Sequence, residues 1–172
     1  MSRGAVDTVG GERRAWLGLG GNVGDVAASF ASALRKLGEV DGLRLRRSSR
    51  LYRTPAWGLT TQADFLNAVV EIEARLAPRD LLAALQAIER AHGRDRANET
   101  RWGPRTLDLD LLAIDGVTLA DPQLALPHPR AHERAFVLVP WAELAPDFVL
   151  PGHGRIDALR DALDRSGIEA IP

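Results

Sequence analysis

Residues 101–112 read RWGPRTLDLDLL, and the second half of this stretch decides the fold. Over residues 106–114, apolar residues enclose two aspartates with the period-two spacing of a β-strand that has one buried face. The leucines on one side should point into a core, so Asp108 and Asp110 should share the other face, about 6–7 Å apart along the strand. The stretch therefore predicts a core strand that presents two neighbouring carboxylates.

The segments before this strand alternate between strand and helix patterns. Asp25 and Gly38 bound a first stretch with apolar residues at helical spacing, and Pro78 and Gly93 bound a second. The predicted strands cover residues 15–19, 43–53, 65–76 and 106–114. The order β-α-β-β-α-β predicts an α+β fold of the ferredoxin-like kind, with an antiparallel sheet and helices on one face.

The sequence after the last core strand predicts smaller additions. Asp115-Gly116 favours a hairpin turn, from which residues 117–120 would return along the preceding strand. Additional C-terminal helices are expected near residues 133–139 and 156–165.

The composition restricts the class of protein. A chain of 172 residues with 45% apolar residues suits one compact domain, so we expect a flexible tail over residues 1–13 and a single domain over residues 14–172. A net charge of −1 argues against nucleic-acid binding, and the lack of cysteine excludes disulfides and thiolate chemistry. No apolar run is long enough to cross a membrane, so a cytoplasmic protein that does not bind membranes is expected.

The aspartate pair suggests a metal site. Two carboxylates this close repel one another unless a cation lies between them, and a hard divalent ion, above all Mg²⁺, suits an oxygen-only site. Arginines at positions 94, 96, 101 and 105 could bind phosphate oxygens beside such an ion. The local chemistry favours a metal with polyphosphate, although a solvent-facing strand whose aspartates pair with arginines stays open.

Long loops and a glycine-rich stretch flank these elements. Residues 54–64 and 93–105 are long connections for a small domain and contain tryptophan and proline, which favours functional loops that close over a ligand. Residues 18–25, GLGGNVGD, lack the third glycine of a dinucleotide fingerprint and favour a tight strand-to-helix turn. The only lysine, Lys36, lies inside a predicted helix, which excludes a P-loop.

Two further groups of residues have open interpretations. Phe65 and Asn67 share a strand face and could stack on and hydrogen-bond a flat heterocycle, or they could be an ordinary core phenylalanine and a capped asparagine. His128 and His132 could contact phosphate or ribose, or they could be simple surface histidines. Pro129 argues against an unbroken helix that would present both histidines to a metal.

Several motifs, in order, resemble those of one enzyme family, the 6-hydroxymethyl-7,8-dihydropterin pyrophosphokinases of folate biosynthesis. The resemblance covers about residues 16–150, and its most specific part is RWGPRTLDLDLL. LYRTPAWG, DFLNAVVEIE and LPHPRAHERAFVL match as well. The resemblance implies an ATP-dependent diphosphokinase that transfers pyrophosphate from ATP to the hydroxymethyl group of the pterin and releases AMP. It also implies two Mg²⁺ ions, with ATP as the co-substrate.

The resemblance assigns roles to single residues. It implies catalytic roles for Arg94, Arg105, Asp108 and Asp110, with Asp108 and Asp110 as the Mg²⁺ ligands. The residues expected to bind the pterin are Thr54, Pro55, Trp57, Phe65, Asn67, Trp102, Asp108 and Phe136. Those expected to bind ATP are Gln86, Glu89, Arg96, Arg101, Arg105, Leu111, His128 and Arg134. The expected partners are these two small molecules, without nucleic acid or membrane, and the chain is expected to be a monomer.

Two other classes of function are the alternatives. One is a ferredoxin-like module that senses a nucleotide or binds RNA, but an RNA-binding sheet would be rich in aromatic residues, which make up only 5% of this chain. The other is a structural interaction domain, which gives no reason for a loop rich in arginine and tryptophan beside two aspartates.

Overall fold

The computed structural model describes residues 11–56, 62–93 and 106–172. Its core elements are β1 (Arg13–Gly21), α1 (Val26–Gly38), β2 (Leu43–Ser48), β3 (Tyr52–Thr54), β4 (Phe65–Ala74), α2 (Pro78–Ala91) and β5 (Asp108–Ile114). Shorter elements follow: β6 (Leu119–Ala120), β7 (Ala125–Leu126), the 3₁₀ turn η1 (Ala131–Glu133), α3 (Ala135–Leu144), β8 (Val149–Leu150), β9 (Gly154–Arg155), α4 (Ile156–Asp161) and β10 (Glu169–Ala170). No helix within the described ranges has the length and apolar character of a membrane span.

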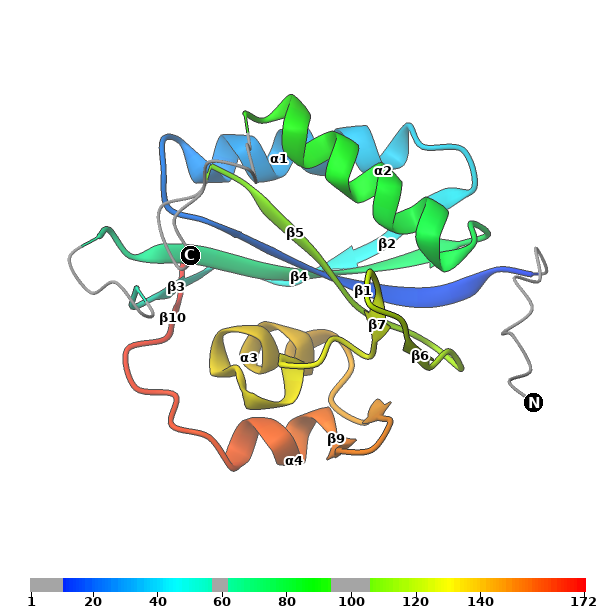
Figure 1. Cartoon of the computed structure of the whole chain (residues 1–172). Helices are drawn as coiled ribbons and strands as arrows, with labels where there is room; N and C mark the ends of the chain where they lie inside the picture. The colour runs from blue at the N-terminus through cyan, green and yellow to red at the C-terminus, as the bar shows by residue number, and fades with distance from the viewer. Residues whose placement is uncertain (1–10, 57–61, 94–105) are drawn as a thin grey trace.

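The central sheet has the predicted ferredoxin-like arrangement (Figure 1). β1 lies between β4 and β5, and the other side of β4 pairs with β2 toward one end and with β3 toward the other. β10 extends the sheet beyond β3. All of these pairings are antiparallel, which confirms the α+β class and the order of the core elements.

One face of the sheet packs against α1 and α2. Alternate residues of the strands, including Leu107, Leu109 and Leu111 beside and within β5, join the inward residues of both helices in one apolar cluster. Oδ1 of Asp25 accepts the backbone N–H of Ala28 at 3.1 Å and so caps the start of α1. The predicted direction of the leucines in the opening motif is therefore confirmed.

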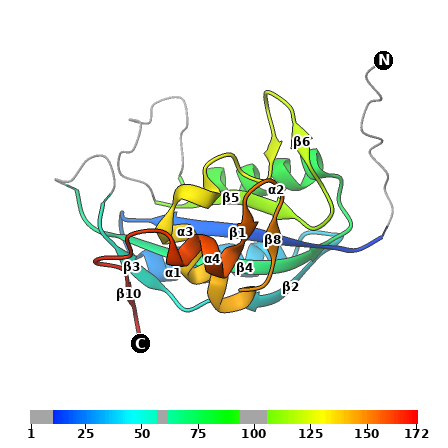
Figure 2. The ribbon, with the colours of Figure 1, turned by 90° about the horizontal axis from the view of Figure 1, so that it is seen from below.

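The opposite face is also covered, which corrects the expectation of helices on one face only. α3 lies against this face and α4 packs on the far side of α3, so helices lie on both sides of the sheet (Figures 1 and 2). Trp16, Leu112 and Trp141 are buried in a second apolar cluster between the sheet and α3. The strands need this cover because they carry apolar residues on both faces, as the nearly continuous burial along β4 shows.

The predicted single strand over residues 43–53 is divided into β2 and β3. Ser49 lies at the break, where its hydroxyl accepts the backbone N–H of Val69 at 3.0 Å and donates to the carbonyl of Arg50 at 2.8 Å. A side-chain oxygen thus takes the place of a backbone partner in the ladder, and the chain resumes its pairing with β4 at Tyr52.

The predicted hairpin after β5 is wrong in its pairing. The Asp-Gly turn forms, but β6 pairs with β7 and not with β5. Two backbone groups of β5 have other partners: the N–H of Leu109 donates to Oε2 of Glu89 at 2.9 Å, and the carbonyl of Leu112 accepts the N–H of His128 at 2.7 Å. These bonds occupy positions that a returning strand would need.

Candidate active site

Polar residues replace apolar ones near one end of the sheet face that α3 covers. β4 contributes Asn67, β5 contributes Asp108 and Asp110, and β1 contributes Gly20. In the register of the sheet, Gly20 is opposite Asn67 on one side and opposite Asp108 on the other. These three residues form a row across the sheet, the Asn67–Gly20–Asp108 row. It places an amide and a carboxylate one strand to either side of a glycine.

Gly20 leaves the middle of this row without a side chain. A Cβ at this position would lie 2.9 Å from Oδ1 of Asn67 and 4.0 Å from Cβ of Asp108. The tight turn predicted over residues 18–25 begins later than expected, because β1 continues to Gly21 and the turn to α1 follows it. The alternate spacing of Gly18 and Gly20, which puts both on one strand face, is the sequence signal that the turn interpretation overlooks.

Asn67 is buried and held by a neighbouring strand. Its Nδ2 donates to Oγ1 of Thr54, the last residue of β3, at 2.7 Å. Both side chains are buried, so this bond fixes the orientation of the amide and directs Oδ1 toward Gly20. An amide fixed in this way can recognise the edge of a flat, polar heterocycle.

Two phenylalanines belong to the same side of the molecule. Phe65 begins β4 opposite Thr54 and is half-buried. Phe136 lies in the first turn of α3, partly buried against the second cluster, and the guanidinium carbon of Arg134 is 5.6 Å from its ring centroid. Pro55 directly follows β3, next to Thr54.

Asp108 and Asp110 share one strand face, as predicted, and both are half-buried. Each also has interactions with other residues, so neither is an isolated charge. Their carboxylates raise the pKa of Arg134, although burial outweighs them and the pKa of that guanidinium lies below its ordinary value. Basic groups from the segment before α3 thus lie within the electrostatic field of the aspartate pair.

His128 is neutral in this environment. Burial, followed by the charge of Arg134, lowers its pKa from 6.5 to about 4. Its Nδ1 accepts the backbone N–H of Arg130 at 3.1 Å, so the ring proton belongs on Nε2. Among the two predicted roles, this arrangement favours a ligand contact, because a neutral ring offers one defined N–H donor.

The remaining predicted nucleotide contacts on α2 and β5 have structural roles as well. Glu89 is buried and accepts the N–H of Leu109, the residue between the two aspartates, so it fixes the position of β5. Gln86 lies one turn earlier on the same helix face and is half-buried. The side chain of Leu111 lies in the core against α1 and α2, so only its backbone could contact a ligand on the other face.

Six of the predicted residues lie outside the described ranges. They are Trp57, Arg94, Arg96, Arg101, Trp102 and Arg105. Much of the two predicted closing loops falls there too. Their roles stay predictions from the sequence.

The neutral state of His128 predicts a pH dependence of stability. The unfolded chain takes up a proton at this ring near its ordinary pKa of 6.5, while the folded chain does so only near 4, so stability is lost as the pH falls through this window. From about pH 7 to about pH 4.5, the free energy of unfolding of the wild type, measured with urea, should fall by about 2 kcal/mol more than that of His128→Gln. Equal losses in both proteins would contradict the assignment.

Comparison with known proteins identifies the family of the chain. A model of the family described as 7,8-dihydro-6-hydroxymethylpterin-pyrophosphokinase matches residues 16–146. A protein of Methylorubrum extorquens named 2-amino-4-hydroxy-6-hydroxymethyldihydropteridine pyrophosphokinase is 51% identical over 158 residues, covering 92% of this chain and 98% of that protein. A Pseudomonas aeruginosa protein of the same name is 41% identical over 160 residues, covering 93% and 98%.

Solved structures agree on the fold. Plasmodium falciparum HPPK-DHPS with pteroate has a TM-score of 0.68 at 14% identity, covering 88% of this chain and 42% of that chain. Another HPPK-DHPS in complex with substrates has a TM-score of 0.66 at 12% identity, covering 88% and 43%. The chain thus spans less than half of these longer chains, and the likeness concerns the fold alone. On the family model and the two close relatives, the chain belongs to the 7,8-dihydro-6-hydroxymethylpterin-pyrophosphokinase family.

Proposed function

We propose that this protein transfers the pyrophosphoryl group of ATP to the hydroxymethyl group of 6-hydroxymethyl-7,8-dihydropterin and releases AMP. The observation that carries the proposal is the Asn67–Gly20–Asp108 row, which puts a fixed amide on the same sheet face as the carboxylate of Asp108, with Asp110 next to Asp108 on that face. The amide suits the heterocycle, and the carboxylates suit the end of the molecule where the phosphates react.

The pterin half of the site uses Asn67 and the surface over Gly20. The absence of a side chain at Gly20 leaves room for a flat ring close to the sheet, and Asn67 hydrogen-bonds the polar edge of that ring. Phe65 and Phe136 stack on its two faces. Thr54 holds Asn67 in place, while Pro55, Trp57 and Trp102 complete the pterin contacts that the family resemblance implies.

The phosphate half uses Asp108 and Asp110 as ligands for Mg²⁺. The described residues contain no group of three or more histidine, cysteine or acidic side chains that could hold a metal ion. Two carboxylates nevertheless fit Mg²⁺, which takes one or two carboxylates and completes its shell with water and substrate phosphates. Two such ions, when bound, neutralise the charge of the phosphates during transfer. Arg134 and the Nε2–H of His128 donate to phosphate or ribose oxygens on the same side.

The reaction itself mainly requires positioning. The oxygen of the hydroxymethyl group attacks the β-phosphorus of ATP, and the bond from that phosphorus to the oxygen bridging it to the α-phosphate breaks. Such transfers depend on alignment and charge neutralisation more than on covalent help from the protein. Gln86, Glu89, Arg96, Arg101 and the backbone of Leu111 contribute to holding ATP, and Arg94 and Arg105 stabilise the transferred group. That the protein is a monomer and lies in the cytoplasm stays a prediction.

The carboxylate pair predicts that substitution of Asp110 lowers activity much more than substitution of an aspartate outside the pair. Asp110→Asn should lower the rate of AMP release from MgATP and the pterin by at least about 100-fold, because it removes a charged ligand from the metal site. Asp115→Asn, just after β5 and half exposed in an ion pair with Arg14, should stay within about twofold of the wild type. Normal AMP release by Asp110→Asn would remove the metal assignment.

The Asn67–Gly20–Asp108 row predicts that alanine at Gly20 weakens pterin binding more than alanine at Gly18. Gly20→Ala should weaken pterin binding by about tenfold or more in calorimetry, because the new methyl group displaces Asn67, and a buried amide left without its partner costs about 1–3 kcal/mol. The three atoms nearest to a Cβ at Gly18 all belong to the side chain of Leu112, the closest at 3.4 Å, so Gly18→Ala serves as the matched control. Equal effects of the two substitutions on pterin binding would contradict the role of the row.

A further inference from the structure

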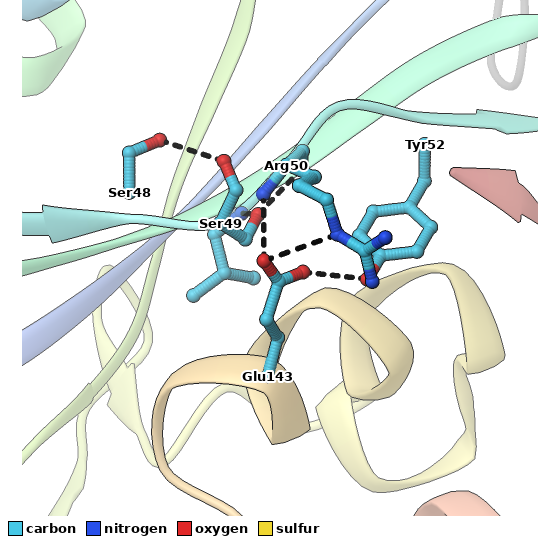
Figure 3. Close-up of polar contacts among 6 residues, drawn as sticks. Ser48, Ser49, Arg50, Tyr52 and Glu143 are labelled. Carbon is cyan, nitrogen blue, oxygen red and sulfur yellow. Dashed lines mark hydrogen bonds and ion pairs between the residues drawn. The ribbon is translucent and has the colours of Figure 1, made fainter. Parts of the chain in front are cut away.

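A cluster of three polar side chains joins α3 to β3 (Figure 3). The hydroxyl of Tyr52 donates to Oε2 of Glu143 at 2.5 Å. Oε1 of Glu143 accepts the backbone N–H of Arg50 at 3.1 Å and its Nε at 3.4 Å. Nη2 of Arg50 also donates to the hydroxyl of Tyr52 at 3.2 Å, which closes the Arg50–Tyr52–Glu143 cluster.

The bond from Tyr52 to Glu143 is the strongest link in the cluster. Tyr52 is buried, and its donor lies against a charged acceptor, a combination that gives short and strong hydrogen bonds. Burial, followed by the hydrogen bond to Glu143, raises the pKa of Tyr52, so the phenol keeps its proton. Arg50 is more exposed and adds charge compensation.

Each end of this link belongs to an element that carries part of the pterin site. Tyr52 begins β3, pairs with Asn67 in the sheet register, and is followed two residues later by Thr54, the acceptor for the Asn67 amide. Glu143 lies in the last turn of α3, the helix whose first turn carries Phe136. Since β3 has only three residues, its few ladder bonds leave its position dependent on such side-chain contacts.

A second attachment of α3 bypasses β3. Nη2 of Arg47 donates to the carbonyl of Leu144 at 2.8 Å, and its Nε donates to Oε2 of Glu71 at 2.8 Å. Arg47 is on β2 and Glu71 is on β4, well along the sheet from Asn67. The C-terminal end of α3 is therefore tied to the sheet twice, and only the Arg50–Tyr52–Glu143 cluster leads to the strand that orients the amide.

We propose that Tyr52 and Glu143 are positioning residues for the pterin, an inference that rests on the proposed function. They hold α3 and β3 in one relative position, so that the Phe136 ring and the Asn67 amide fit the same heterocycle. Neither residue touches the reacting atoms. Their loss therefore affects the binding of the pterin and leaves the binding of ATP nearly unchanged.

The test measures KM for each substrate, by AMP release, in Tyr52→Phe, Glu143→Gln and the double variant. Tyr52→Phe removes the hydrogen bond to a charged group and Glu143→Gln removes the charge that strengthens it, so each should raise KM for the pterin by about fivefold or more, with KM for ATP within about twofold. The double variant should be no worse than the more affected single variant, because both changes act on the same bond: Tyr52→Phe removes its donor, and Glu143→Gln removes the charge of its acceptor.

Arg47→Ala is the matched control. It removes the other attachment of α3, so it should lower the melting temperature while the ratio of the two KM values stays at the wild-type level. Equal changes in both KM values, no change in either, or the same shift in Arg47→Ala would overturn the positioning role. Should Glu143→Gln fail to fold, Tyr52→Phe alone decides. If the wild type releases no AMP with the pterin, the proposed function is wrong, and the positioning role fails with it.

Discussion

The alternation of side chains along β1, β4 and β5 is the constraint on which the site depends. Each residue of these strands is committed to one of two faces, and both faces are covered by helices. Leucines on one side of β5 anchor the strand in the core, and this anchoring keeps Asp108 and Asp110 on the other side. A slip of one residue would move both carboxylates into the apolar core, so hydrophobic packing fixes the position of the polar site.

The far face of the sheet is divided along its length. Trp16, Leu112 and Trp141 fill one part with an apolar cluster, and the Asn67–Gly20–Asp108 row occupies another. α3 serves both parts, since its middle is buried in the cluster while Arg134 at its start lies in the field of the aspartates. Burial disfavours the charge of Arg134 and the two carboxylates favour it, so burial and the aspartates act on this guanidinium in opposite directions.

The sequence predicted local features well and non-local ones poorly. The period-two pattern around Asp108 correctly placed the two aspartates on one face, and the element order correctly gave the ferredoxin-like core. α3 is apolar nearly all round, so its sequence does not say which surface it covers, and its place on the opposite face was not predicted. The break at Ser49 depends on a side-chain bond to a strand 20 residues away, which no local pattern records.

In the site, too, local features were predicted from the sequence and non-local ones were not. Asn67 and the aspartates were singled out from the strand pattern and given roles by the family resemblance, whereas their proximity depends on strand register that a single sequence does not specify. Gly20 was missed because a glycine-rich stretch before a helix is usually a turn, and its role appears only once two other strands flank it. The Tyr52–Glu143 bond joins residues 91 positions apart and has no sequence signature.

We propose that one sheet face binds the pterin and the metal side by side. A crystal structure of the protein with a non-hydrolysable ATP analogue, the pterin and Mn²⁺ in place of Mg²⁺ tests it most directly, because Mn²⁺ is located by its anomalous scattering. We expect Mn²⁺ bound to the carboxylates of Asp108 and Asp110, with the pterin over Gly20 and hydrogen-bonded to Asn67. Mn²⁺ away from both aspartates, or a pterin that does not contact Asn67, would contradict it.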